Sequence, residues 1–120
     1  MKTVLIVAGE TSGDNHAGLL VREMKALNPD LKFFGIGGDK MEAEGVELLT
    51  HVDSISFMGF IEVIRHIPRM RFLMDTLRDE AQRRQADLAI LVDYPGFNLR
   101  LAKMLRALPD DTRPRIFYYI

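Results

Sequence analysis

Val4-Leu5-Ile6-Val7-Ala8, followed by Gly9-Glu10-Thr11-Ser12-Gly13-Asp14, is the stretch that decides the fold, because an aliphatic run leads directly into a glycine-bearing turn and then into a helix-forming segment. Two glycines let the backbone turn sharply and approach a ligand closely. The helix that follows directs its N-terminal amides towards whatever binds in the turn. The sequence therefore predicts a strand, a ligand-binding loop and a helix at the start of the chain.

The rest of the chain alternates short aliphatic runs with longer helical patterns, which is typical of a parallel sheet covered by helices on both faces. We expect strands at residues 3–8, 31–36, 46–49, 88–92 and 115–119. We expect helices at residues 14–27, 40–44 and 98–108, and a longer helical region at 56–85. Gly45 is a candidate left-handed end for the second helix, and Pro68 predicts a kink or a division in the long region. The predicted fold is a three-layer α/β structure with a Rossmann-like parallel sheet.

Composition predicts one globular domain over residues 1–120. With 48% hydrophobic and 28% charged residues and a net charge of −1, the chain can bury a core and has no overall field that would attract nucleic acid. It contains no cysteine, and its apolar N-terminal run is too short for a signal peptide or a membrane span, so we expect a cytoplasmic protein. A parallel strand that ends the chain normally continues into a crossover helix, so we also expect the domain to be truncated at its C-terminus.

Two polar loops follow strands that we expect to be neighbours at the point where the strand order reverses. One loop is residues 9–14, and the other begins with Asp93, directly after the strand at 88–92. Ligands of doubly wound sheets bind beyond the carboxyl ends of such strands. We therefore expect the Glu10 and Asp93 carboxylates to converge there, with an ionised Asp93 able to accept a proton from an attacking hydroxyl.

Simpler roles exist for the same residues. Gly9 and Gly13 could serve the turn alone, Ser12 or Asp14 could cap the first helix, and Asn98 is a natural N-cap for the helix at 98–108. The glycine spacing is neither a dinucleotide fingerprint nor a P-loop. Three scattered histidines without cysteine predict no metal site, although His16 could touch a ligand.

The long helical region carries a second pattern. Most of its apolar residues fall on one stripe that predicts ordinary packing against the sheet, namely Phe60, Val63, Ile64, Ile67, Met70, Met74, Leu77 and Ala81. Phe57, Ile61 and Phe72 lie off this stripe among basic residues that include Arg65, Arg69 and Arg71. Apolar side chains interleaved with arginines suit contact with an acyl chain or an anionic lipid surface. The alternative is a surface that meets a partner domain or a loop.

Four segments together resemble the lipid-A-disaccharide synthase family, in the family's order and spacing. They are Ala8-Gly9-Glu10-Thr11-Ser12-Gly13-Asp14, Phe34-Gly35-Ile36-Gly37-Gly38 with Met41 and Glu44-Gly45, Phe57-Met58-Gly59-Phe60-Ile61-Glu62-Val63, and Val92-Asp93-Tyr94-Pro95-Gly96-Phe97-Asn98. The closing residues 116–120 also look like the strand that leads into the family's next segment. The resemblance covers the whole chain.

This resemblance implies the N-terminal, acceptor-side half of an inverting GT-B glycosyltransferase without a metal or bound cofactor. The donor would be UDP-linked diacylglucosamine, and the acceptor would be diacylglucosamine 1-phosphate at the inner-membrane surface. Asp93 would be the base, and the substrate-binding residues would be Gly9, Glu10, Thr11, Ser12, Gly13, Asp14 and Asn98. Acyl chains or the membrane would contact Met58, Ile61, Phe72, Arg65 and Arg69. Gly96 stands where several relatives carry an acid, and the missing nucleotide-binding half predicts that this chain alone is inactive.

Two other functions are alternatives to this one. Another GT-B enzyme with a UDP-sugar and a lipid-linked acceptor would be expected to begin with a Gly-Gly-Thr-Gly-Gly-His type of loop, which residues 9–14 do not resemble. A non-catalytic flavodoxin-like binding module would be favoured by thermal stabilisation with a nucleotide or a flavin.

Overall fold

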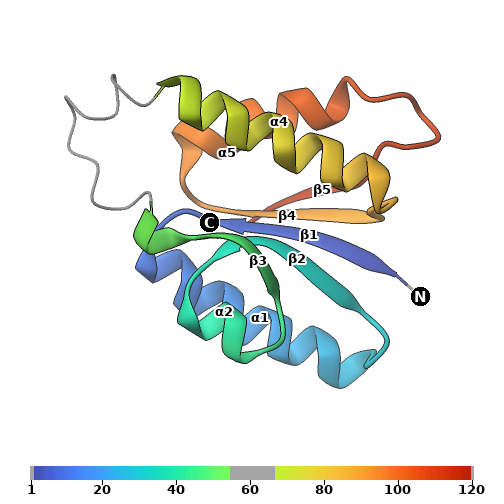
Figure 1. The fold of residues 1–120 in the computed structure, drawn as a ribbon. Coiled ribbons are helices and arrows are strands. Elements are labelled where there is room, and N and C mark those ends of the chain that lie inside the picture. The colour runs from blue at the N-terminus through green and yellow to red at the C-terminus, as the bar shows by residue number, and fades with distance from the viewer. Residues whose placement is uncertain (1, 55–66, 120) are drawn as a thin grey trace.

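A computed structural model of the chain, which describes residues 2–54 and 67–119, has five parallel strands between two layers of helices. Helices α1 and α2 cover one face of the sheet, and α4 and α5 cover the other (Figure 1). The elements are β1 (Thr3–Ala8), α1 (Thr11–Leu27), β2 (Lys32–Gly37), α2 (Asp39–Ala43), β3 (Glu47–His51), the 3-10 turn η1 (Val52–Ser54), α4 (Ile67–Arg83), β4 (Leu88–Val92), α5 (Pro95–Arg106) and β5 (Arg115–Tyr119). The predicted three-layer α/β fold is confirmed.

The strand order is β3-β2-β1-β4-β5, so the chain moves outward from β1 to one edge and then returns to place β4 on the other side of β1. The order of the strands therefore reverses between β1 and β4, as expected. The pairing register runs from Val4 opposite Leu88 to Ala8 opposite Val92. Both strands consequently end at the same level, and the loops after Ala8 and Val92 begin side by side.

Strand β1 is the centre of both cores. Leu5 and Val7 pack in the core under α4 and α5, whereas Val4, Ile6 and Ala8 pack in the core under α1 and α2. This alternation follows from the pleat of a strand, which directs successive side chains to opposite faces. Each fully buried aliphatic side chain contributes roughly 1.5–3 kcal/mol. The unbroken run of apolar residues from Val4 to Ala8 therefore fits the place of β1 in the middle of a sheet that is covered on both faces.

The helix limits differ from prediction at both site loops. Helix α1 begins at Thr11 with Glu10 as an extended N-cap that makes no side-chain cap hydrogen bond, so neither Ser12 nor Asp14 caps it. Helix α5 begins at Pro95 instead of Asn98, because proline lacks the amide that the first turn leaves unpaired and its φ suits that turn. The predicted N-cap role of Asn98 is therefore wrong.

Two predictions about helix ends have different outcomes. Gly45, which follows the C-cap residue Glu44 of α2, has φ of +93°, a conformation that favours glycine, so the expected left-handed end is confirmed. Pro68 is the second residue of the described helix α4, and the structure does not test whether the helical region is kinked or divided there. The expected helical region upstream of Pro68 falls mostly on residues 55–66, which lie outside the described residues. Met74, Leu77 and Ala81 are buried against the sheet, as their stripe predicted.

Candidate functional site

The loops after β1 and β4 touch each other through Gly9 and Tyr94. A Cβ atom added to Gly9 would lie 2.2 Å from a ring carbon of Tyr94, so only glycine lets the Tyr94 ring lie against this part of the backbone. Gly9 therefore serves the contact between the two loops as well as the turn after β1. Glu10, Thr11 and Ser12 follow it and are exposed at this carboxyl edge of the sheet.

Asp93 is held in an unusual backbone conformation at the end of β4. Asp93 and Tyr94 have φ of +46° and +50°, which residues other than glycine rarely adopt. The Asp93 amide donates to the Tyr119 carbonyl at 2.7 Å, and the Asp93 carbonyl accepts from the Tyr118 hydroxyl at 2.9 Å. With its main chain fixed by β5, the Asp93 side chain remains exposed. Strained backbone of this kind is concentrated at functional sites.

Asn98 fixes the same turn from inside the protein. Its buried amide nitrogen donates to the Asp93 carbonyl at 2.8 Å and lies 3.3 Å from the Val92 oxygen and 3.4 Å from the Val7 oxygen. The opposite amide orientation would place Oδ1 against these carbonyl oxygens, so the environment dictates which atom faces them. The structure thus brings Asn98 to the site underneath Asp93, where it joins the ends of β1 and β4.

Asp14 is placed differently from the other residues of its loop. Its side chain is only 3% exposed and accepts three hydrogen bonds, from the amides of Gly38, Lys40 and Met41 at 2.8–3.0 Å. These amides lie at the start of α2, so the carboxylate caps a neighbouring helix instead of its own. Gly13 is also buried, and a Cβ atom added to it would lie 3.3 Å from the Cβ atom of Ala8.

Tyr94 and Tyr118, two tyrosines that were not expected from the sequence as site residues, also lie at this edge of the sheet. Burial, followed by the charge of Glu10, raises the pKa of the Tyr94 phenol. Burial, followed by the charge of Asp93, raises the pKa of the Tyr118 phenol. The carboxylates of Glu10 and Asp93 therefore each raise the pKa of one phenol at this edge of the sheet. Both phenols keep their proton at neutral pH and can donate a hydrogen bond. The position of Tyr94 between Asp93 and Pro95, in a loop after a buried strand, is the signal that could have identified it.

An apolar groove of about 870 Å³ opens beside the Asp93 loop, between α4 and α5. Met70, Met74, Phe97 and Met104 line it, and Tyr94 and Gly96 form the end nearest the loop. Three cationic side chains also border the groove: Arg71, Arg100 and Lys103. The groove therefore combines apolar walls with positive charge and reaches the candidate site.

The residues expected to contact acyl chains or a membrane are only partly described. Phe72 is 71% exposed on α4, a large apolar side chain in water, and Arg69 is exposed one turn before it. Met58, Ile61 and Arg65, together with Phe57 of the same pattern, lie outside the described residues. His16 is exposed on α1, and its ring centre lies 6.4 Å from that of Tyr119.

Across residues 2–54 and 67–119, no helix has the length and hydropathy needed to span a bilayer. Within the same residues, no three metal-ligating side chains gather closely enough to hold a metal ion.

The sequence model of the family described as Lipid-A-disaccharide synthetase matches residues 4–120, the strands and loops of this site included. The chain belongs to the lipid-A-disaccharide synthase family. A synthase of this family from Myxococcus xanthus is 52% identical over 105 residues, which cover 88% of this chain and 27% of the relative. Relatives named lipid-A-disaccharide synthase in Nitrosococcus oceani and Coxiella burnetii are 44% and 36% identical, over 98% and 99% of this chain and 29% and 31% of their own lengths.

The chain thus spans about three tenths of the lipid-A-disaccharide synthases that it matches. The matched region includes both loops of the candidate site. The suspected family is confirmed, and its fold agrees with the five-stranded parallel sheet described above.

Proposed function

We propose that this chain forms the acceptor-side domain of a glycosyltransferase that makes the lipid A disaccharide. The observation that carries the proposal is the exposed Asp93 carboxylate, whose backbone is fixed in a strained conformation at the reversal point of the sheet. Fold alone would not indicate a reaction, but an exposed acid beyond the carboxyl ends of two neighbouring strands is suited to proton transfer to a ligand bound there. Family membership supplies the reaction class.

In the proposed reaction, a hydroxyl of diacylglucosamine 1-phosphate attacks the anomeric carbon of UDP-linked diacylglucosamine. The new glycosidic bond forms as the bond to the UDP oxygen breaks, UDP leaves with the electron pair, and the configuration inverts. Asp93 accepts the proton of the attacking hydroxyl. General-base assistance of this kind contributes about 100-fold to 10,000-fold.

The remaining site residues have two kinds of role in this proposal. Glu10, Thr11 and Ser12 are exposed beside Asp93, so their carboxylate and hydroxyl groups can hydrogen-bond to the acceptor sugar. Asn98 acts as a positioning residue because it holds the Asp93 carbonyl from below. Gly9 admits the Tyr94 ring, and Gly13 and Asp14 support the loop through α1 and α2.

The lining of the groove between α4 and α5 is evidence for an acylated substrate. Its methionines and Phe97 offer flexible apolar walls, and Arg71, Arg100 and Lys103 supply cations that suit an acidic head group. Exposed Phe72 and Arg69 extend the same character over α4. We infer that the protein works at the cytoplasmic surface of the inner membrane, where these residues contact acyl chains or anionic lipid, together with Met58, Ile61 and Arg65.

A second, nucleotide-binding half is required in this proposal, because the chain spans about three tenths of the lipid-A-disaccharide synthases that it matches. The 120-residue chain alone should bind the acceptor and should not form disaccharide from purified substrates. Product formation by this chain would contradict the division of labour between two halves.

A chimera tests the function directly. Residues 4–120 would replace the matching segment of the Myxococcus xanthus relative, and disaccharide and UDP would be measured with purified lipid substrates. We expect transfer at a rate within about tenfold of the relative, which corresponds to a change in barrier of roughly 1.4 kcal/mol. A folded chimera, as judged by circular dichroism and a cooperative thermal transition, that makes no disaccharide would contradict the proposed function.

A further inference from the structure

A second pocket lies at the opposite end of the sheet, where the strands begin. It has a volume of about 510 Å³, and the residues that line it include Lys25, Lys32, Phe33, Phe34, Glu47 and Arg84. We call it the amino-edge pocket. Thr3 and Lys32 are the first residues of β1 and β2, whereas the candidate active site follows the last residues of β1 and β4. The two sites are therefore separate.

The pocket exists because β3 starts late along β2. The first residue of β3, Glu47, pairs with Phe34, so Lys32 and Phe33 pair with β1 on one side and have no β3 partner on the other. This leaves a notch at the edge of the sheet. Phe33 and Phe34 point to opposite faces, into the two cores, and their buried rings form the floor of the notch.

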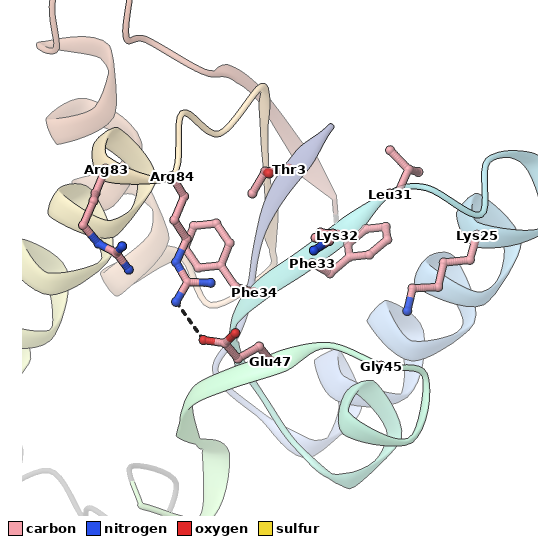
Figure 2. Close-up of a pocket in the computed structure, with 10 residues that line it drawn as sticks. All are labelled: Thr3, Lys25, Leu31, Lys32, Phe33, Phe34, Gly45, Glu47, Arg83 and Arg84. Atoms are coloured by element: carbon pink, nitrogen blue, oxygen red, sulfur yellow. Dashed lines mark hydrogen bonds and ion pairs between the residues drawn. The ribbon is translucent and has the colours of Figure 1, made fainter. Parts of the chain in front are cut away.

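Cationic side chains enter the notch from both faces of the sheet. Figure 2 shows Lys25 from α1 and Arg84 beyond the end of α4 on opposite sides of the pocket, with their charged ends directed inward. Lys32 and Arg83 also line the pocket, so it has four cationic residues. Its lining contains one carboxylate, that of Glu47. Positive charge gathered in a concave site with buried walls attracts a small anion.

Two of the cations are already held in place. The Lys25 ammonium donates to the Glu44 carbonyl at 2.8 Å and lies 5.8 Å from the Phe33 ring centre. The Arg84 guanidinium stacks 4.6 Å from the Phe34 ring centre and donates to Glu47 at 2.7 Å and Glu80 at 2.8 Å. Cations ordered in advance lose less side-chain entropy when an anion binds.

Charge within the pocket is only partly neutralised. The carboxylates of Glu47 and Glu80 pair with the two arginines, and these arginines hold the pKa of both acids below their usual range. Among the described residues, neither Lys25 nor Lys32 has a carboxylate within 4.0 Å. The two lysines therefore leave positive charge available for an external ligand.

We propose that the amino-edge pocket binds a small, soluble molecule that carries a diphosphate or a phosphate ester. Phosphate oxygens accept the charge-assisted hydrogen bonds that Lys25, Lys32 and the free edge of the Arg84 guanidinium can donate. The volume lies within the range of small-molecule sites, roughly 300–1,000 Å³, and exceeds what a single inorganic ion fills. The proposal does not depend on the proposed transferase reaction.

Titration of the purified chain with pyrophosphate tests this site, using calorimetry and backbone amide chemical shifts. We expect saturable binding, with shifts concentrated at Lys25, Lys32 and Gly45. Lys32→Gln, at an exposed position, should weaken binding by at least about fivefold, since it removes a charge-assisted hydrogen bond. Lys25→Gln should do the same. Arg22→Gln removes an exposed cation of α1 outside the pocket and is the matched control.

Several results would overturn the proposal. The first is the absence of saturable binding up to about 10 mM pyrophosphate, since a specific ligand should bind more tightly than this. The second is chemical-shift changes that spread over all basic residues. The third is an equal loss of pyrophosphate affinity in the Arg22→Gln and Lys32→Gln variants. Co-sedimentation with phosphatidylglycerol vesicles distinguishes the source of the phosphate. Vesicle binding that Lys32→Gln abolishes, without binding of pyrophosphate, would show a membrane contact in place of a soluble ligand.

Discussion

Asp14 and Asn98 are the two polar side chains that the described part of the chain buries, and each satisfies backbone groups at a loop of the site. Their residue types and positions were evident in the sequence, and so was their association with the two loops. Their partners could not be predicted, because Asp14 binds amides 24–27 positions further along the chain, and Asn98 reaches the end of β1, 91 positions before it. Such contacts depend on tertiary structure, which helix-capping rules for local sequence do not include.

Replacement of Asp14 should lower the stability of the fold considerably, because its carboxylate accepts three backbone hydrogen bonds. Asp14→Ala leaves three amides at the start of α2 without their acceptor, and we expect a loss of about 3 kcal/mol in the free energy of unfolding. Urea denaturation followed by circular dichroism measures this. Glu23→Gln, at an exposed position of the same helix, should change stability by less than about 0.5 kcal/mol. Equal effects of the two substitutions would contradict the capping role.

At the scale of elements, the strand–loop–helix units were largely predictable, because the buried strands are continuous aliphatic runs. The limits of β1, β4 and β5 agree with prediction to the residue. The starts of α1 and α5 do not agree. Sequence rules favour N-caps whose side chains bond to the helix, whereas α1 begins after Glu10, which makes no such bond, and α5 begins at Pro95, whose missing amide and fixed φ suit a first turn.

The two site loops should behave as one unit in a double-mutant cycle. Gly9→Ala places a methyl group on the Tyr94 ring and should cost about 2 kcal/mol of stability, whereas Tyr94→Ala should cost less. In the double variant the clash is gone, so the two costs should not add. We expect an interaction energy of at least about 1 kcal/mol from thermal or urea unfolding of all four proteins. Additive costs would show that the two loops do not depend on each other.

The end of α4 is joined to the sheet by ion pairs that predict a pH dependence. Hydrogen bonds from Arg83 and Arg84 lower the pKa of Glu80 from 4.5 to about 2. Because the pKa is lower in the folded state, the stabilisation is complete above pH 4.5 and is lost as the pH falls towards 2. Glu80→Gln should therefore destabilise the chain at neutral pH, and its difference from wild type should shrink across this window.

Unfolding free energies measured between pH 7 and pH 2.5, in steps of about half a unit, provide this comparison. Asp79→Asn on the same helix, where the carboxylate is exposed, is the control. A Glu80→Gln effect of constant size over the whole range would contradict the role of the two arginines.

For the whole molecule, the reversal of strand order next to β1 brings the two polar loops together, and the sequence pattern allowed this to be expected. The apolar groove between α4 and α5 was not predictable in the same way. The pattern in the long helical region indicated a lipid-facing surface, but the groove also needs Phe97, Arg100, Lys103 and Met104 of α5, which are about 30 residues away in sequence and meet α4 only in the folded sheet. The amino-edge pocket likewise depends on where β3 begins relative to β2.

The central claim, that Asp93 is the base of a glycosyl transfer, is tested most directly by Asp93→Asn in the Myxococcus xanthus chimera that carries residues 4–120. Disaccharide formation should fall by at least about 100-fold, with an unchanged thermal transition, because the amide cannot accept the proton. Asp53→Asn, at an exposed acid near the end of β3, should leave turnover within about twofold of the parent chimera. Turnover of the Asp93→Asn protein close to that of the parent would contradict the account.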